Sequence, residues 1–338
     1  MKKVLIATTA LVGTAGMAAA EISFSGNARF GLTYQEADRT DDAGREQEVV
    51  LEQRLRFQVQ GTATSDNGLE FEARFRAEAG EDVDNSISGG GFGAAGFAVS
   101  TGGLRLDVGH VSDVTDSGDT FGYYGAAEVG FTAFLGQYSN ASGAALGSIG
   151  GFGSGDASQT TIKLRYNVGD FTVAASYSNN EQSAVDETGL IGLGNDIDEF
   201  QIGVGYSFGN YRVGLNYIDV DGDIETTDAT TGEVTARVGV EDDAIVLGLS
   251  GEIGAASFSV LIADADEQDD TLFGASLNYD IGAATAIQVA FSDGGASGND
   301  TAFGVGFSHS LGGGVTLGGG GQNTSGDTVA DLGVSFGF

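Results

Sequence analysis

Two stretches of the chain, residues 49–60 and 69–78, carry arginines at alternate positions with apolar side chains between them. These arginines are Arg54, Arg56, Arg74 and Arg76. A period of two is typical of an extended strand whose two faces meet different surroundings. The arginines would therefore form a row of positive charge along one face. Charged rows beside water select ions and polar solutes by size and electric field.

The apolar positions of the same stretches decide which face meets lipid. In the first stretch they are Val49, Leu51, Leu55, Phe57 and Val59, and in the second Leu69, Phe71, Ala73, Phe75 and Ala77. An arginine on a lipid-facing position near mid-depth costs roughly 2 to 4 kcal/mol, so a one-residue slip exposing four of them costs on the order of 10 kcal/mol. We therefore expect the arginines to point into a water-filled lumen.

This alternation recurs along the chain and predicts the fold. Short turns are expected at residues 64–68, 100–103, 167–170, 207–210, 252–255, 279–284 and 310–314. Longer polar or glycine-rich loops are expected at about 35–48, 79–91, 110–158, 179–197, 219–240, 264–270, 292–300 and 320–328. These connections predict an all-β fold, a 16-stranded antiparallel transmembrane β-barrel with both ends on the short-turn side. Closure would pair residues 22–34 with residues 329–338, which end on Phe338.

The longest loop, residues 110–158, carries the candidate acidic residues of the channel. They are Asp113, Asp116, Asp119 and Glu128. Loops longer than about 15 residues are usually functional or disordered, and the aromatic side chains of this one indicate packing. We interpret it as the third long loop, folded into the lumen so that its carboxylates face the arginines and constrict the pore.

The other basic residues divide between predicted strands and predicted loops. On strands lie Arg29, Arg105, Lys163, Arg165 and Arg212, of which Arg29 and Arg105 extend the basic side of the constriction. In the first and fifth long loops lie Arg39, Arg45 and Arg237. The pore's basic side is thus expected to consist of Arg29, Arg54, Arg56, Arg74, Arg76 and Arg105.

The first 20 residues predict export. Lys2 and Lys3 precede a short apolar run that ends in Ala18, Ala19 and Ala20, the order of a secretory signal peptide. The run is shorter than the roughly 18 to 20 residues that a transmembrane helix needs. We expect cleavage of residues 1–20, which leaves the barrel as residues 21–338.

Charge and composition exclude several classes of protein. After loss of Lys2 and Lys3 the chain keeps 12 of its 14 basic residues against 48 acidic ones, a formal charge of −36. That excess argues against nucleic acid as a partner and favours cations in the channel. The chain has no cysteine, so it forms neither disulfides nor thiolate sites. Its 58 glycines would also suit disorder or a calcium-binding solenoid, but they follow no fixed short period.

Several segments resemble one known family, the Rhodobacter-type general diffusion porins of alphaproteobacteria. The segments are EISFSGNARFG (21–31), TSDNGLEFEARFRAE (64–78), FGNYRVGLNY (208–217), YDIGAA (279–284), SLGGGVTLGGG (310–320) and VADLGVSFGF (329–338). The resemblance covers essentially the whole chain after residue 20 and is strongest at both ends and in the third strand.

This resemblance implies a homotrimer in the Gram-negative outer membrane, with periplasmic termini and an inward third loop. It implies an eyelet of arginines facing carboxylates that passes ions and small hydrophilic solutes. It further implies recognition of Phe338 by the outer-membrane assembly machinery. The acidic loops separately suggest contact with lipopolysaccharide of the surrounding lipid membrane, through divalent ions that bridge them to its phosphates. We expect no required cofactor, and the acidic loops are the candidate sites for a structural calcium ion.

Two other classes of function are weighed against a channel. A barrel enzyme is disfavoured because the chain has only two histidines, His110 and His309. His110 stands near Ser112 and Asp113, but adjacency in sequence is not the geometry of a catalytic triad. A calcium-binding adhesin is suggested by acidic runs such as DVDGDIE (219–225), which lacks the spacing of a full EF-hand loop.

Overall fold

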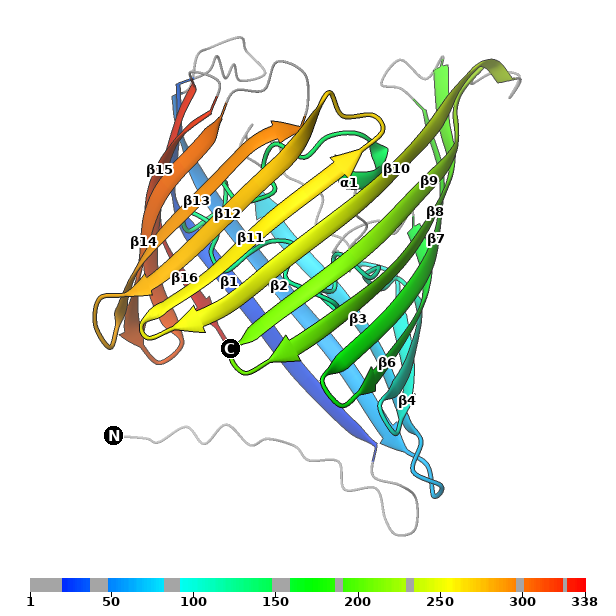
Figure 1. Ribbon diagram of the computed structural model, residues 1–338, viewed down its shortest axis with the longest axis horizontal. Coiled ribbons are helices and arrows are strands. Elements are labelled where there is room, and N and C mark those ends of the chain that lie inside the picture. Colours follow the sequence, from blue (N-terminus) through cyan, green and yellow to red (C-terminus); the bar gives the residue numbers. More distant parts are fainter. Residues whose placement is uncertain are drawn as a thin grey trace, which may run out of the picture.

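The computed structural model forms one closed antiparallel barrel of sixteen strands (Figure 1). It describes residues 20–36, 48–81, 92–147, 159–185, 191–228, 234–295, 301–324 and 327–338. The first strands are β1 (Glu21–Gln35), β2 (Val49–Thr64), β3 (Glu70–Glu81), β4 (Gly96–Thr101), β5 (Leu104–Gly109), β6 (Gln159–Val168), β7 (Phe171–Val185) and β8 (Ile191–Phe208). The others are β9 (Tyr211–Asp228), β10 (Val234–Ile253), β11 (Ala256–Ala265), β12 (Asp270–Asp280), β13 (Thr285–Gly295), β14 (Ala302–Gly312), β15 (Val315–Thr324) and β16 (Asp327–Gly337). One short helix, α1 (Ala144–Gly147), follows β5.

The barrel closes where the first strand pairs with the last. β1 and β16 are antiparallel over nine residue pairs, from Asn27 opposite Gly337 to Gln35 opposite Val329. Pairing of the chain's two ends removes the exposed strand edges that an open sheet would leave. The predicted closure is therefore confirmed, and the ends of β1 and β16 meet at the rim formed by the short turns.

All seven predicted short turns are present, but three of the predicted long loops are largely strand. One of them is residues 320–328, where β15 continues to Thr324 and β16 begins at Asp327. β7 and β8 extend through most of residues 179–197, and β9 and β10 extend through most of residues 219–240. Arg237, expected in a loop, lies on β10 and forms ion pairs with Asp223 at 3.7 Å and with Glu225. The signal-peptide prediction and the predicted loop positions of Arg39 and Arg45 lie outside the described residues.

These extensions escaped the sequence prediction because the alternation of side chains reverses along them. Within the apolar band of β9, Leu215 and Tyr217 face outward and Asn216 faces inward. Further along β9 the outward positions are acidic, whereas the inward Ile218 and Val220 are buried. Strand hydrophobicity thus follows the surroundings of each face rather than one fixed pattern.

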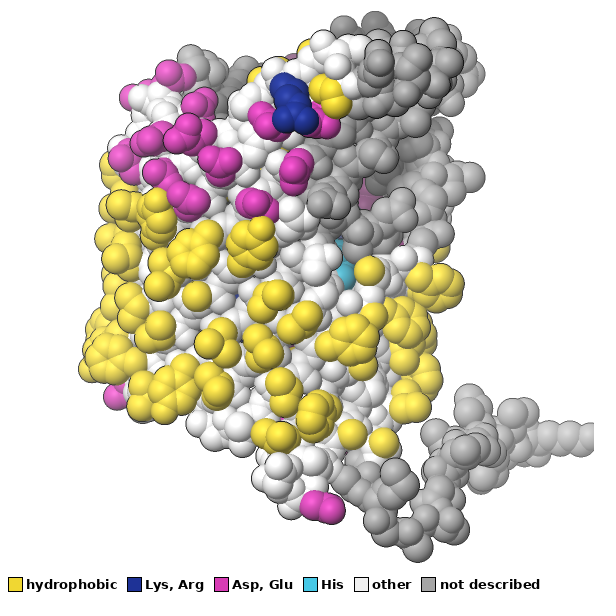
Figure 2. All heavy atoms as spheres, turned by 90° about the vertical axis from the view of Figure 1, so that its right-hand side faces the viewer, with side chains coloured by type: hydrophobic (Ala, Val, Ile, Leu, Met, Phe, Trp, Pro, Cys, Tyr) yellow, Lys and Arg dark blue, Asp and Glu magenta, His cyan; other side chains and the backbone are white. Residues whose placement is uncertain are grey.

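The outer surface carries an apolar band with acidic side chains at its upper edge (Figure 2). Exposed apolar residues such as Ile202 and Leu247 form the band. The acidic residues belong to the outward positions of the long strands, among them Asp198, Asp219, Asp221, Glu241 and Asp243. An apolar girdle with polar edges is the surface expected of a membrane-spanning barrel. No helix among the described residues is long and apolar enough to cross a membrane.

The hydrophobic core lies inside the barrel, between the wall and the segment after β5. We call the described residues 110–147 the inward loop. Phe121, Tyr123 and Leu146 of this loop pack against inward apolar side chains of β9 to β12, such as Val246 and Leu261. Figure 1 shows the loop within the ring of strands. The loop therefore occupies part of the interior along one half of the wall.

Candidate functional site

The inner wall formed by β1 to β6 carries paired charges. It lies opposite the half of the barrel wall that most of the inward loop covers. The ion pairs are Arg29–Glu52 (2.6 Å), Arg56–Glu78 (2.6 Å), Arg74–Glu72 (3.7 Å), Arg105–Glu72 (3.3 Å) and Arg105–Asp107 (2.9 Å). The side chains of these arginines are 19–26% exposed, so they line accessible space. Paired charges on a wetted wall are far less costly than bare charges in a dry core.

Arg54 and Arg76 stand among these pairs on β2 and β3. Arg76 Nε donates a hydrogen bond to Gln58 Oε1 at 3.1 Å, and Asp116 of the inward loop attracts its charge. Arg54 lies beside Arg29 and Arg56, whose like charges oppose its own. Its Nε is buried without a hydrogen-bond partner in the described structure. The most crowded positive charge of the wall is therefore on β1 to β3.

Among the four candidate carboxylates, Asp116 acts on the charge of an arginine of β3, Arg76. It is partly exposed, accepts a hydrogen bond from Tyr124 Oη at 2.5 Å, and attracts Arg76 across the channel. The distribution of charge is thus a basic wall with an acidic loop residue facing it. Such a transverse field orients and selects polar solutes.

Asp119 lies elsewhere than expected, against β6. It is buried and forms ion pairs with Lys163 at 2.9 Å and with Arg165 at 2.6 Å. Burial alone would raise the pKa of Asp119, but Lys163 and the hydrogen bonds from its neighbours outweigh burial and hold the pKa below its usual value. Asp119 therefore anchors the loop to the wall as a charged group.

Asp113 and Glu128 also differ from the simple expectation of charges that face the arginines. Asp113 is fully buried, and burial together with the charge of Glu199 raises its pKa well above the usual range. Burial raises the pKa of Glu128, which accepts a hydrogen bond from Tyr138 Oη at 2.7 Å. Desolvation favours the neutral form of each carboxyl, whereas the hydrogen bond from Tyr138 favours the ionised form of Glu128.

Three tyrosines form a cluster on the inward loop. The ring centroids of Tyr123, Tyr124 and Tyr138 are 5.0–5.5 Å apart, with edge-to-face contacts at Tyr124. Burial, followed by the neighbouring carboxylates, raises the pKa of each phenol. The phenols therefore remain protonated hydrogen-bond donors, and two of them fix the carboxyl groups of Asp116 and Glu128.

Polar side chains of the wall bind the backbone of the inward loop. The N–H groups of loop residues donate to Ser176 Oγ (3.3 Å), Gln201 Oε1 (2.9 Å), Asp242 Oδ2 (2.8 Å), Ser276 Oγ (2.7 Å), Ser292 Oγ (3.0 Å) and Asp331 Oδ2 (2.8 Å). These acceptors come from six different strands, β7, β8, β10, β12, β13 and β16. A buried backbone N–H without a partner is costly, so these bonds fix the path of the loop.

Glycines on the inner wall allow the loop to lie close to it. A side chain at Gly205 or Gly214 would place its Cβ 2.5 or 2.7 Å from the carbonyl oxygen of Thr120. A Cβ at Gly248 would overlap the ring of Phe121, and one at Gly274 would overlap the backbone of Gln137. These four wall glycines therefore have a specific use, which is to let the inward loop approach the wall closely.

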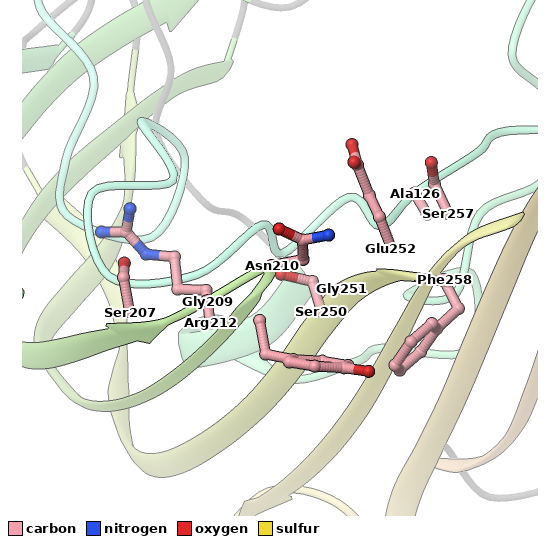
Figure 3. Close-up of a pocket in the computed structure, with 11 residues that line it drawn as sticks. Ala126, Ser207, Gly209, Asn210, Arg212, Ser250, Gly251, Glu252, Ser257 and Phe258 are labelled. Atoms are coloured by element: carbon pink, nitrogen blue, oxygen red, sulfur yellow. The ribbon is translucent and has the colours of Figure 1, made fainter. Parts of the chain in front are cut away.

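A recess of about 450 Å³ lies between the loop at Ala126 and the short-turn ends of β8 to β11. Figure 3 shows Arg212 beside Ser207 at one end of the recess and Glu252 with Ser257 at the other. Arg212 Nε donates to the carbonyl oxygen of Thr120 at 2.6 Å, so the same residue supports the loop. The recess thus offers opposite charges and hydroxyl groups to a small polar solute.

Neither histidine is arranged for catalysis in the described structure. His110 is buried where β5 ends, and His309 lies on β14, where its Nδ1 and Thr285 Oγ1 share a hydrogen bond of 2.7 Å. Among the described residues no group of three or more histidine, aspartate or glutamate side chains is placed to hold a metal ion.

The sequence prediction missed the wall residues that hold the loop, above all Asp331. The carboxylate of Asp331 accepts hydrogen bonds from the loop at Phe131 and Thr132. Its signal was present, because it is an inward acidic residue in a strand whose next inward residues are only glycine and serine. Nothing in the sequence showed which part of the loop it would meet.

The comparisons with known proteins agree on one family. A family model described as Gram-negative porin matches residues 7–329. A porin of Fuscovulum blasticum is 30% identical over 328 residues, covering 94% of this chain and all of the relative. A porin of Rhodobacter capsulatus is 27% identical over 340 residues, with 94% and 100% covered. Among solved structures, an engineered variant of the Rh. blastica porin matches with a TM-score of 0.69 at 25% identity, covering 94% of this chain and 100% of that one.

Proposed function

The chain belongs to the family of Gram-negative porins, and from this premise we propose how it conducts and what it contacts. It is a general diffusion porin, a water-filled outer-membrane channel for ions and small hydrophilic solutes. Membership of a family of channels excludes the enzyme alternative. The observation that supports the proposed pathway best is the division of the interior. The inward loop packs on β7 to β16, whereas partly exposed ion pairs line β1 to β5.

We propose that the channel prefers cations. Most arginines of the wall have carboxylate partners within 4 Å, so the wall itself is nearly balanced. The excess acidic charge lies at the edge of the barrel above the apolar band, where it raises the local concentration of cations (Figure 2). The constriction is proposed to lie between Asp116 and the arginines, chiefly Arg54, Arg56, Arg74 and Arg76, with Arg29 and Arg105 at its sides.

Conductance across a planar bilayer tests this proposal. Purified protein should produce stepwise, ohmic conductance, and a salt gradient should give a reversal potential of the sign expected for cation preference. Absence of solute flux would refute the channel. Flux with a reversal potential of the opposite sign would leave the channel intact and refute the preference for cations.

The short strands support a proposal that the protein is a homotrimer. β4 and β5 have six residues each, whereas a membrane-spanning strand needs about 9–11 residues. That part of the wall is too short to face the full thickness of lipid, and contact with neighbouring copies would cover it. Light scattering of the detergent-solubilised protein should give three chains per particle, and a monomeric mass would contradict the proposal.

The remaining contacts follow from the same membership and are proposals. Residues 1–20 would be removed on export, both ends of the barrel would face the periplasm, and Phe338 would be recognised by the assembly machinery. The acidic upper edge would contact lipopolysaccharide phosphates through divalent cations such as calcium. Chelation should then lower the thermal stability of the trimer in lipopolysaccharide, and an unchanged melting temperature would count against bridging ions.

A further inference from the structure

Residues 129–135 form a compact turn within the inward loop, which we call the loop tip. Val129 and Leu135 pair as an isolated antiparallel bridge, with Val129 N donating to Leu135 O at 2.8 Å. Gly130 and Ala133 both adopt positive φ angles, of 90° and 59°. Positive φ is uncommon for alanine, so the surroundings of the tip must hold it in this conformation.

The loop tip lies on the seam where β1 meets β16. Gly31 of β1 and Gly333 of β16 are directly opposite each other across the seam. A Cβ built on either glycine would lie 2.6 Å from ring atoms of Phe131. Gly318 of β15 forms a third side of this hollow, with Phe131 Cβ 3.3 Å from the position of its own Cβ. The ring of Phe131 therefore fills a hollow that two strands from opposite ends of the chain create together.

Both strands of the seam also bind the next residue of the tip. Arg29 of β1 donates from Nη1 to Thr132 O at 3.3 Å, while Glu52 holds its guanidinium at 2.6 Å. Asp331 of β16 accepts from Thr132 N at 2.8 Å and from Thr132 Oγ1 at 2.6 Å. Asp331 also accepts from Phe131 N at 3.2 Å. Thr132 is thus held from β1 on one side and from β16 on the other.

We propose that the loop tip is an internal clamp on barrel closure, in addition to its part in narrowing the channel. Glycine weakens a strand because it brings no side chain to pack, and the seam has two of them face to face. Phe131 supplies the missing side chain from within the lumen. The two strands come from opposite ends of the chain and pair over nine residues. The tip gives them a third element that bonds to both.

This arrangement sets an order of events in assembly. The hollow for Phe131 and the two polar partners of Thr132 come together only when β1 has paired with β16. The tip docks after closure, so the channel is wide during assembly and becomes narrow once the barrel is sealed. The inference concerns the seam and does not depend on which solutes pass.

Hydrogen exchange of the folded protein in detergent, followed by mass spectrometry, tests the clamp. Phe131→Ala should speed exchange in β1 and β16 at least tenfold while β9 and β10 remain protected. The matched control is Phe121→Ala, because Phe121 packs on Gly248 of β10, away from the seam. Phe121→Ala should speed exchange in β9 and β10 and spare the seam. The clamp would be overturned if exchange at the seam were equally fast in the two variants. It would also be overturned if exchange at the seam of Phe131→Ala were no faster than in the unmodified protein.

A covalent lock gives an independent test, since the chain contains no cysteine. Leu32 and Leu332 are opposite each other in the seam and face outward, so Leu32→Cys with Leu332→Cys can bridge β1 and β16. The oxidised bridge should restore most of the melting temperature lost in Phe131→Ala and little of that lost in Phe121→Ala. Equal rescue of the two variants, or no rescue of Phe131→Ala, would overturn the inference. Should Phe131→Ala fail to fold, Phe131→Leu in the same comparison carries the same expectations.

Discussion

Replacement of Asp331 by asparagine should release the loop tip from the wall. Asp331 is 7% exposed, and its carboxylate accepts hydrogen bonds from Phe131 N, Thr132 N and Thr132 Oγ1 at 3.2, 2.8 and 2.6 Å. Asparagine keeps one acceptor oxygen but turns an NH₂ group toward a backbone N–H. The variant therefore loses at least one strong charge-assisted bond and leaves a buried donor without a partner.

The size of this effect follows from the geometry. A hydrogen bond to a charged group contributes about 1.5–3 kcal/mol, and an unsatisfied buried donor costs about 1–3 kcal/mol. The Thr132 hydroxyl can turn and accept a hydrogen bond from the asparagine NH₂ group, which offsets part of this loss. We therefore expect the free energy of docking of the tip to become less favourable by about 2–4 kcal/mol. That corresponds to roughly a 30- to 900-fold fall in the ratio of docked to undocked tip.

Single-channel recording measures the consequence. Release of the tip frees space in the lumen, so Asp331→Asn should show larger mean conductance and more open-channel noise. The matched control is Asp264→Asn, which makes the same chemical change at an exposed outward residue bonded to Thr271. Conductance and noise of Asp331→Asn equal to those of the control would refute the docking of the tip through this carboxylate.

Three further predictions follow from the site. Replacing Arg54, Arg56, Arg74 and Arg76 together by glutamine should shift the reversal potential toward stronger cation preference, and an unchanged potential would show that these arginines do not line the constriction. Gly205→Ala with Gly214→Ala should lower the melting temperature by several degrees through about 1–3 kcal/mol of overpacking against Thr120, whereas Gly61→Ala, with open space around it, should change little. Lys163 and Arg165 hold the pKa of Asp119 below its usual value, against the effect of burial. Ionised Asp119 therefore stabilises the fold at every pH above the usual aspartate pKa of about 3.9. This stabilisation is lost as the pH falls through the lower pKa of the folded state. The difference in melting temperature between the unmodified protein and Asp119→Asn should therefore shrink below about pH 4, and a difference that stays constant down to about pH 2 would contradict the assigned ion pairs.

The barrel could be predicted from the sequence because lipid imposes a strict rule on each spanning strand. A one-residue slip at Arg54 or Arg74 would place charge in lipid, so the alternation fixes both the face and the register. Turn sequences rich in glycine and asparagine then located the seven short turns between neighbouring strands. The rule fails above the membrane, where Ile218 and Val220 face inward to the loop and acidic residues face outward to water.

The candidate site could be predicted only in part, because its contacts join residues far apart in the chain. The basic wall could be predicted because Arg54, Arg56, Arg74 and Arg76 alternate with apolar residues along their strands. The partners of the loop did not, since Asp119 pairs with Lys163 and Arg165 instead of facing the arginines of β2 and β3. The use of the wall glycines could not be predicted either, because it depends on the backbone of the inward loop that lies against them.

The central claim is that water and solutes pass along β1 to β6 while the inward loop fills the other half of the interior. Single cysteines in this cysteine-free chain, treated with a charged water-soluble thiol reagent during current recording, test it most directly. Gln58→Cys on the wetted wall should react within seconds and alter the current. Val246→Cys, which is buried beneath Phe121, should leave the current unchanged. Equal reactivity at the two positions, or reaction at Val246→Cys alone, would contradict the account.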